Sequence, residues 1–236
     1  MPAQPIRPSY SVGKSPAINI DFKGNAYLLR WDGDWRITPD LTLFPLVDDA
    51  SVTLIQHSKR INELWATSEV LAYGADSHIR VLHSCGGEFS VYKVAINDRQ
   101  RRLLQEEFSM IEHLSSKDIP VIRVHQERLT DEQGIFGFRM ERLSNIDIDN
   151  AAEYISEIAK AFEEVHRSGV VHNDISPRNI MLNQKGLVTI IDFGRAGYIG
   201  QEVPPIKAVG KTNEKEIYSV ESDNDSLEIV NGMYQF

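Results

Sequence analysis

The stretch from Val170 to Gly194, VVHNDISPRNIMLNQKGLVTIIDFG, constrains this chain more than any other segment. It combines His-x-Asp, an asparagine five residues after that aspartate, and Asp-Phe-Gly beginning thirteen residues after the asparagine. A His-x-Asp triplet alone is common by chance, whereas both spacings together with Asp-Phe-Gly are not. For any one of these residues alone, a solvated loop carboxylate or a buried core histidine is the better interpretation, so only the set is informative. Its members are His172, Asp174, Asn179, Asp192, Phe193 and Gly194.

The set resembles the catalytic loop and the metal-binding loop of the protein-kinase-like superfamily, which read H-R-D-L-x-x-x-N and D-F-G. The resemblance implies an α+β, two-lobed fold with a β-rich N-lobe and a shortened helical C-lobe. It implies that Asp174 is the catalytic residue that orients an attacking hydroxyl. Asn179 and Asp192 would be the oxygen ligands of Mg²⁺, a hard cation that bridges the phosphates of ATP. The apolar run Val188–Ile191 predicts the buried strand that delivers Asp192.

Two positions of the catalytic stretch depart from the H-R-D-L-K pattern of serine/threonine kinases. Asn173 replaces the arginine that can bind an activation-loop phosphate in those kinases, so we do not expect that form of control. Ser176 replaces the lysine that gives a cation to the γ-phosphate. Arg178, four residues after Asp174, could supply this cation, as in the D-L-A-A-R-N form of tyrosine kinases. We therefore include Arg178 among the catalytic residues.

Lys93 lies in a predicted strand whose alternation places it on the same face as Phe89, Val91 and Ala95. A lysine among apolar neighbours needs an anionic partner. By resemblance to the family's V-A-I-K motif, Lys93 would hold the α- and β-phosphates of ATP as a catalytic and nucleotide-binding residue. Val91 would lie against the adenine.

The partner of Lys93 is expected on the helix predicted over residues 98–114. Glu107 lies on the apolar face of that helix, four residues before Ile111, where an unpaired carboxylate would be costly. We predict a Lys93–Glu107 ion pair. Glu106, one position round the helix, is the second candidate.

Gly74 and Val81 are spaced like the first glycine and the valine of the phosphate-covering loop, G-x-G-x-x-G-x-V. Asp76 and Ile79 stand where the later glycines would be. A backbone without those glycines approaches phosphates less freely, and Asp76 would repel them. This departure favours a protein that binds ATP weakly.

The segment Met140-Glu141-Arg142-Leu143 resembles the hinge between the two lobes. Hinge recognition in the family uses main-chain donors and acceptors, so backbone groups of Glu141 and Leu143 would bind the adenine edge beside Met140. A plain strand end is the alternative.

Periodicity, caps and turn residues predict further elements. Asp223 resembles the aspartate that opens the large-lobe helix and braces the catalytic loop; an ordinary capping aspartate is the alternative. The helix over 98–114 would be capped by Asn97 or Asp98, and a second helix over 150–166 by Asn150. The predicted strands are 70–73, 78–82, 89–96, 121–128 and 134–140.

We expect three segments along the chain: a flexible tail over 1–17, a β-rich accessory segment over 18–63 and a kinase-like domain over 64–236. In the accessory segment we expect a hairpin across Asp32-Gly33-Asp34 and short strands over 41–47 and 52–55. The domain would comprise an N-lobe over 64–140, a hinge over 141–145 and a truncated C-lobe over 146–236, in which the peptide-binding helices of the family are missing.

The composition of the chain limits the kinds of partner and compartment that we expect for it. A net charge of −9 without a basic cluster argues against nucleic acid or an anionic membrane. The single cysteine, Cys85, suits a reducing compartment. The N-terminus lacks the apolar region of a secretory signal, and no apolar run approaches the ~18 residues of a membrane span. We expect an intracellular, cytoplasmic protein.

Together these features predict an ATP- and Mg²⁺-dependent kinase that transfers the γ-phosphoryl group to a hydroxyl. Protein serine or threonine is the favoured acceptor. A small-molecule kinase is one alternative, suggested by the short large lobe. A catalytically idle nucleotide-binding pseudokinase is the other, and the complete set of Lys93, Glu107, Asp174, Asn179 and Asp192 argues against it.

Overall fold

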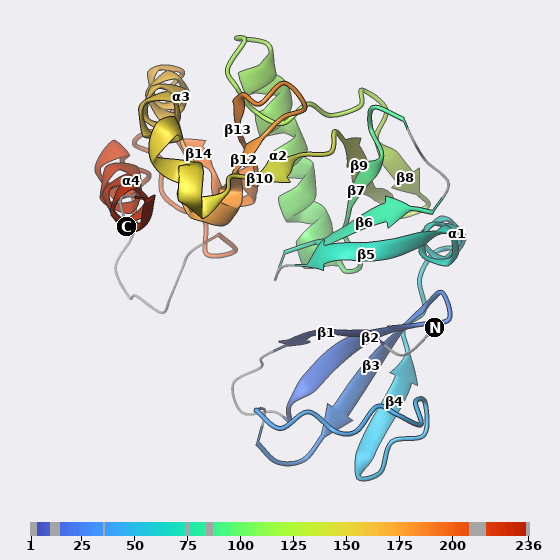
Figure 1. Ribbon diagram of the computed structural model, residues 1–236. Helices are drawn as coiled ribbons and strands as arrows, with labels where there is room; N and C mark the ends of the chain where they lie inside the picture. The colour runs from blue at the N-terminus through green and yellow to red at the C-terminus, as the bar shows by residue number, and fades with distance from the viewer. Residues whose placement is uncertain are drawn as a thin grey trace.

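A computed structural model gives the fold in three successive parts (Figure 1): an N-terminal sheet, a second sheet with a long helix against it, and a mainly helical C-terminal part. The predicted α+β class is confirmed. Among the described residues, none of the helices has the length and apolar character that crossing a bilayer requires. The structure describes residues 4–9, 15–34, 36–73, 76–83, 87–207 and 216–234.

The N-terminal sheet has four antiparallel strands in sequence order, and its first strand lies within the segment predicted as a tail. The hairpin predicted across Asp32-Gly33-Asp34 is wrong. The tight turn instead lies at Lys23-Gly24, where both residues have positive φ (49° and 73°). The strands are β1 (Gln4–Ser9), β2 (Ala17–Phe22), β3 (Asn25–Trp31) and β4 (Ala50–Leu54).

Residues 41–47 form turns, so the strand predicted there is wrong. Some apolar side chains of this segment, those of Leu41, Phe44 and Val47, pack against the sheet, whereas Leu43 and Leu46 are exposed. The ring of Phe44, which is buried, contacts those of Phe22 and Tyr27 edge-on at 5.1 and 5.2 Å between centroids. Phe44 therefore contributes to the core of this sheet from a turn and not from a strand.

The second sheet has the order β5-β6-β7-β9-β8, and all of its neighbouring strands are antiparallel. The strand predicted over 121–128 is wrong. Val121 and Val124 form only isolated bridges, to Ile190 and Met140, because this segment crosses from one sheet to another. The strands are β5 (Ser68–Tyr73), β6 (His78–Leu82), β7 (Val91–Val94), β8 (Leu129–Asp131) and β9 (Gly134–Met140).

Helix α1 (Lys59–Thr67), which the sequence analysis missed, precedes this sheet and buries Trp65. Trp65 belongs to the joint between the two sheets, a cluster formed by Asp21, Trp65, Ser68 and Arg80. Asp21 of β2 accepts hydrogen bonds from Trp65 Nε1 at 2.7 Å and from Arg80 Nη1 of β6 at 2.6 Å. Arg80 also donates to Ser68 Oγ at 2.8 Å, and its guanidinium lies 4.1 Å from the Trp65 ring centroid. This buried cluster connects the two sheets.

Helix α2 (Asp98–Ser115) lies against the second sheet (Figure 1). The predicted cap is confirmed: the side chain of Asn97 accepts a hydrogen bond from the Gln100 amide at 3.0 Å. The predicted apolar stripe is buried, and Phe108 contacts Phe138 of β9 at 5.3 Å between ring centroids. Burial of this stripe orients α2 so that Glu107 faces Lys93 of β7.

The C-terminal part is built around α3 (Ile155–Arg167), which a 3-10 helix over Ile148–Tyr154 precedes. The cap predicted at Asn150 is wrong, because Asp147 caps the 3-10 helix by accepting from the Asp149 amide. Core residues of α2, α3 and β13 form one continuous apolar cluster. The other elements are β10 (Ser144–Asn145), β11 (Val170–Val171), β12 (Ile180–Leu182), β13 (Val188–Ile190), β14 (Gly197–Tyr198) and α4 (Val220–Tyr234).

Candidate active site

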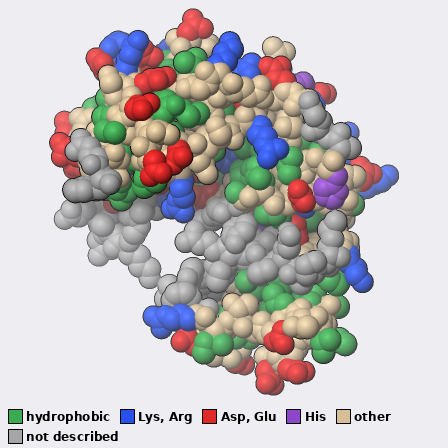
Figure 2. Space-filling view, in the orientation of Figure 1, with side chains coloured by type: hydrophobic (Ala, Val, Ile, Leu, Met, Phe, Trp, Pro, Cys, Tyr) green, Lys and Arg blue, Asp and Glu red, His purple; other side chains and the backbone are tan. Residues whose placement is uncertain are grey.

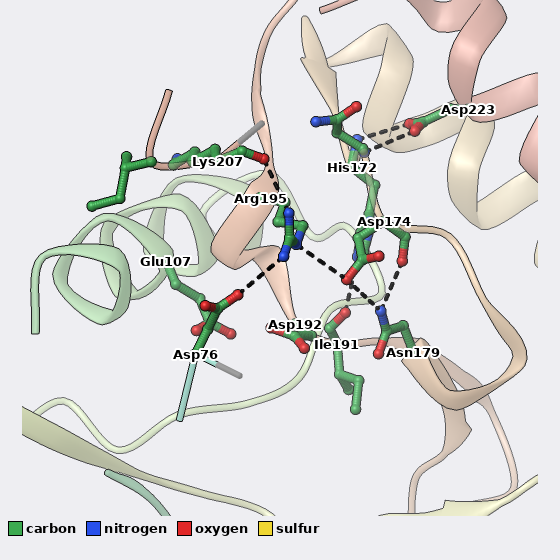
Figure 3. A network of polar contacts seen from close by, with 12 residues as sticks. Asp76, Glu107, His172, Asp174, Asn179, Ile191, Asp192, Arg195, Lys207 and Asp223 are labelled. Carbon is green, nitrogen blue, oxygen red and sulfur yellow. Dashed lines mark hydrogen bonds and ion pairs between the residues drawn. The ribbon is translucent and has the colours of Figure 1, made fainter. Parts of the chain in front are cut away.

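The loop after β11 is held by a carboxylate from α4, more than forty residues later in the chain. Asp223 accepts hydrogen bonds from the backbone amides of His172 at 2.7 Å and Asn173 at 2.8 Å (Figure 3). Asp223 is 1% exposed. Asn173 has φ 60°, a left-handed conformation that asparagine tolerates better than most residues. The predicted bracing role of Asp223 is confirmed.

His172 connects this loop to the end of β13. The side chain is fully buried, and its Nε2 lies 2.9 Å from the carbonyl oxygen of Ile191. Its ring also contacts that of Phe193 at 4.8 Å between centroids. His172 is therefore a core residue that holds the loop after β11 against the segment after β13.

Asp174 and Asn179 face each other across the loop (Figure 3). Asn179 Nδ2 donates to the Asp174 carbonyl at 2.7 Å and lies 3.5 Å from Asp174 Oδ2. The Ile191 amide donates to the Asn179 carbonyl at 3.0 Å, which places Asn179 beside the residue that precedes Asp192. The Asp174 side chain is 43% exposed, so it remains accessible to a substrate.

The predicted Lys93–Glu107 ion pair is confirmed, and Asp192 completes a triad. Lys93 Nζ lies 2.7 Å from Glu107 Oε1 and 2.8 Å from Asp192 Oδ1. Lys93 and Glu107 are buried, whereas the Asp192 side chain is 42% exposed. Glu106, the second candidate, points away and pairs with Lys207 at 2.8 Å. Helical periodicity thus selected the correct glutamate.

Burial and the charges of Lys93, Glu107 and Asp192 shift the pKa values of these three groups. Burial opposes the charged amine, but the attraction of Asp192 and Glu107 outweighs it and raises the pKa of Lys93. Burial raises the pKa of Glu107 to about 7, although Lys93 opposes part of that rise. The positive charge of Lys93 lowers the pKa of Asp192. Asp192 is therefore the carboxylate that stays ionised and partly open to solvent.

Asp192 and Asn179 fit a Mg²⁺ ion by the chemistry of their donors. Both offer oxygen atoms, which Mg²⁺ prefers, and the remaining ligands of such a site are usually waters and phosphates. The amide nitrogen of Asn179 is used by Asp174, which leaves the amide oxygen for a ligand. Asp192 has a left-handed backbone (φ 65°, ψ 60°) at the end of β13. No group of three or more His, Cys, Asp or Glu suited to a metal occurs in the described part of the chain.

Three residues predicted to bind the nucleotide lie in one row across the second sheet. Val81 of β6 is opposite Val91 of β7, which is opposite Met140 of β9. Directly opposite residues present their side chains on the same face of a sheet. Val91 and Met140 are buried and Val81 is half-buried.

The predicted hinge follows β9 directly. The buried Glu141 side chain is bound by Arg123, whose Nη2 lies 2.9 Å from Oε2, and the Glu141 amide donates to the Arg123 carbonyl at 3.1 Å. Within the described residues, the Glu141 carbonyl and the Leu143 amide make no backbone hydrogen bond. These two groups are the ones that a bound base could use.

The phosphate-covering loop is described only in part, and Gly74 lies outside the described residues. Asp76, predicted to repel phosphates, is bound by two arginines. It forms ion pairs with Arg99 of α2 and with Arg195, the residue after Asp-Phe-Gly. The repulsion expected from Asp76 is therefore offset.

Arg178, predicted to act beside Asp174, makes no ion pair with it in the described part of the chain. Arg178 is the middle residue of the 3-10 helix Pro177–Asn179, and this turn buries Asn179 while leaving Arg178 exposed. Arg195 lies there instead, with Nε 3.9 Å from Asp174 Oδ2. The sequence signal for Arg195 is its position directly after the Asp-Phe-Gly motif.

Comparison with known proteins agrees with this geometry. Residues 90–214 match the family Protein kinase domain. Over 53 residues the chain is 45% identical to cGMP-dependent protein kinase, isozyme 1, of Drosophila melanogaster, covering 22% of this chain and 7% of that protein. Over 123 residues it is 28% identical to serine/threonine-protein kinase PknG of Mycobacterium leprae, covering 48% and 16%. Over 88 residues it is 34% identical to an Aurora kinase of Patiria pectinifera, covering 33% and 22%. The chain thus spans less than a quarter of the length of each of these relatives.

Proposed function

This chain belongs to the protein kinase domain family, and we propose that it transfers the γ-phosphoryl group of ATP to a hydroxyl. The observation that carries the proposal is the convergence of five side chains from β7, α2 and the two loops. Each of them is held by contacts within the site. They are Lys93, Glu107, Asp174, Asn179 and Asp192.

In the proposed reaction, Asp174 accepts a hydrogen bond from the acceptor hydroxyl and aims its oxygen at the γ-phosphorus. The new bond joins these two atoms, and the bond from that phosphorus to the β,γ-bridging oxygen breaks. The hydroxyl proton passes to Asp174, and ADP leaves with the bridging oxygen. Asp192 and Asn179 would hold Mg²⁺, which neutralises charge on the phosphates.

The adenine and the inner phosphates would be held by the second sheet. The row Val81, Val91 and Met140 supplies an apolar surface, and the free backbone groups of Glu141 and Leu143 supply hydrogen bonds. Lys93 would hold the α- and β-phosphates. Because Glu107 fixes the lysine at 2.7 Å, the cation is positioned before the nucleotide arrives.

Thermal unfolding tests the nucleotide and metal parts of this proposal. The melting temperature should rise with ATP and Mg²⁺ together, and rise less with ATP and a chelator. Asp192→Asn should lose most of the Mg²⁺-dependent rise. Asp225→Asn, an exposed aspartate of α4, is the matched control and should retain it. A melting temperature that no nucleotide changes would support an idle module instead.

We infer a protein serine or threonine as the acceptor, because relatives of this chain are named as serine/threonine-protein kinases. Incubation with γ-labelled ATP separates the possibilities. Label on the protein itself or on casein supports a protein acceptor. Label that appears only on added sugars, amino alcohols or other metabolites would assign a small-molecule acceptor.

A further inference from the structure

Arg195 lies at the centre of the polar network around the proposed active site (Figure 3). Its Nη1 donates to the carbonyl of Lys207 at 3.1 Å. Its Nη2 lies 3.5 Å from Asp76 Oδ2, and its Nε lies 3.9 Å from Asp174 Oδ2. The side chain is 22% exposed. The guanidinium is therefore held in place and still accessible.

The backbone fixes Arg195 relative to both loops of the site. It is the last residue of the 3-10 helix Phe193–Arg195, which begins directly after Asp192. A phosphoryl group that moves from the side of Asp192 toward a hydroxyl at Asp174 must pass beside this guanidinium. Negative charge is spread over the three equatorial oxygens of that group during transfer, so a neighbouring cation stabilises it.

The other buried cations near the site, Lys93 and Lys207, are already paired with carboxylates. Among the described residues, the ion pairs to Asp174 and Asp192 come from Arg195 and Lys93. Lys93 is shared by two carboxylates. The buried amine of Lys207 is bound to Glu106 at 2.8 Å and to the Ala196 carbonyl at 2.9 Å.

We propose that Arg195 is the residue that binds the transferred γ-phosphoryl group, a role that rests on the proposed phosphotransfer. A guanidinium has five N–H donors arranged to match phosphate oxygens in pairs. In the structure, the hydrogen bond to Lys207 is the shortest contact that these donors make with the described residues. The remaining donors are at 3.5 Å or more from carboxylate oxygens, so a phosphate can take them without breaking a strong bond.

Asp76 is the anion that the phosphate would replace. It sits in the segment between β5 and β6, at the position of the phosphate-covering loop, and Arg99 of α2 binds its other oxygen. Exchange of Asp76 for a phosphate oxygen keeps Arg195 paired and leaves Asp76 with Arg99. Asp76 is therefore the counter-ion of Arg195 before the nucleotide binds.

The test compares the dissociation constants of ATP and ADP, each with Mg²⁺, by calorimetry, together with kcat. Only ATP carries the γ-phosphate, so Arg195→Gln should weaken ATP binding about tenfold or more and ADP binding less than twofold. It should also lower kcat. Arg195→Lys keeps the charge without the paired donors and should show an intermediate loss. Arg167→Gln, in the exposed pair with Glu163 on α3, is the matched control and should change neither constant.

Several results would overturn the inference while the proposed function stands. One is an equal loss of ATP and ADP affinity in both Arg195 variants. Another is the selective loss of ATP affinity in Arg178→Gln with Arg195→Gln unchanged. Asp76→Asn should strengthen ATP binding about threefold by removing the competing anion, and a weakening would exclude the exchange. If the wild-type protein binds neither nucleotide, the proposed function itself fails.

Discussion

Two buried cations of this protein differ in the number of carboxylates that face them. Arg80, 1% exposed, faces Asp21 at 2.6 Å in the joint between the two sheets. Lys93, 5% exposed, faces both Glu107 and Asp192, at 2.7 and 2.8 Å. With all groups ionised, the first cluster is neutral and the second carries one net negative charge.

This difference decides what each cluster can do. Burial lowers the pKa of Arg80, and the single carboxylate of Asp21 offsets only part of that effect. At Lys93 the two carboxylates outweigh burial and raise the pKa. In the neutral Arg80 cluster, each charge is already paired and no member is exposed to bind a further ion. The Lys93 cluster has a second carboxylate, Asp192, whose side chain is 42% exposed and can still accept a metal ion. We therefore propose a structural role for the Arg80 cluster and a functional role for the Lys93 cluster.

The largest expected effect is loss of stability at the joint. Arg80→Met would leave Asp21 without its cation, at a cost of about 3–5 kcal/mol in the free energy of unfolding. Urea denaturation measures this cost, and Arg30→Met, at an exposed arginine of β3, is the control. Nucleotide affinity of the folded variant should be retained. Little destabilisation together with lost ATP binding would reverse the two roles.

The second expected effect is coupling within the functional cluster. A double-mutant cycle of Lys93→Met and Glu107→Gln on ATP affinity should show non-additivity of roughly 2–3 kcal/mol. Glu112 and Arg128, an exposed pair 2.8 Å apart between α2 and the loop before β8, give the reference cycle, with coupling below about 1 kcal/mol. Additive effects at Lys93 and Glu107 would show that the pair does not prepare the nucleotide site.

The Lys93–Glu107 pair of the functional cluster could be predicted from sequence because both residues belong to regular patterns, whereas the contact of Lys93 with Asp192 was not predicted. Strand alternation placed Lys93 on a core face, and helical spacing placed Glu107 opposite it. The Arg80 cluster had no such signal. Asp21 and Arg80 are 59 residues apart on different sheets, and neither lies in a motif. Their contact depends on how the two sheets are placed, which local periodicity does not determine.

The third effect is a pH dependence located at the structural cluster. Burial lowers the pKa of His78 from 6.5 to about 4, and its ring contacts Trp65 of the same cluster. The unfolded chain binds a proton below pH 6.5 and the folded chain does not until about pH 4. Stability from this residue is therefore present above pH 6.5 and is lost as the pH falls through this window. The loss should be roughly 2 kcal/mol at pH 5.

His78→Phe removes the titration and keeps a ring at this position. Between pH 7 and pH 5, the variant should lose less unfolding free energy than the wild-type protein by about the same 2 kcal/mol. Urea denaturation at the two pH values gives the comparison. Parallel pH profiles for both proteins would mean that His78 titrates normally in the folded state.

The smallest effect compares two helix caps. Asn97→Ala removes the cap of α2, and Ser58→Ala removes the cap of α1, whose hydroxyl accepts from the Ile61 amide at 3.3 Å. Each should cost about 1 kcal/mol of stability. Because α2 carries Glu107, only Asn97→Ala should also weaken ATP binding. Equal effects on ATP affinity would show that α2 does not transmit the change to Lys93.

The candidate catalytic loop illustrates where motif spacing stops being informative. The spacing gave Asp174, Asn179 and Asp192, and the structure brings them to one place. It could not decide between Arg178 and Arg195, because that choice depends on the direction in which a short 3-10 helix turns its side chains. The turn that buries Asn179 leaves Arg178 exposed, and a different turn aims Arg195 at Asp174.

The central claim is that the Lys93 cluster and its two loops form a working phosphotransfer site. The most direct test is turnover of Asp174→Asn at saturating ATP and Mg²⁺, with labelled phosphate followed to the acceptor. The substitution should lower kcat by about 10²–10⁴-fold, because the hydroxyl loses its general base, while the ATP dissociation constant stays within about twofold. Unchanged kcat with weakened ATP binding would contradict the claim and leave Asp174 with a structural role.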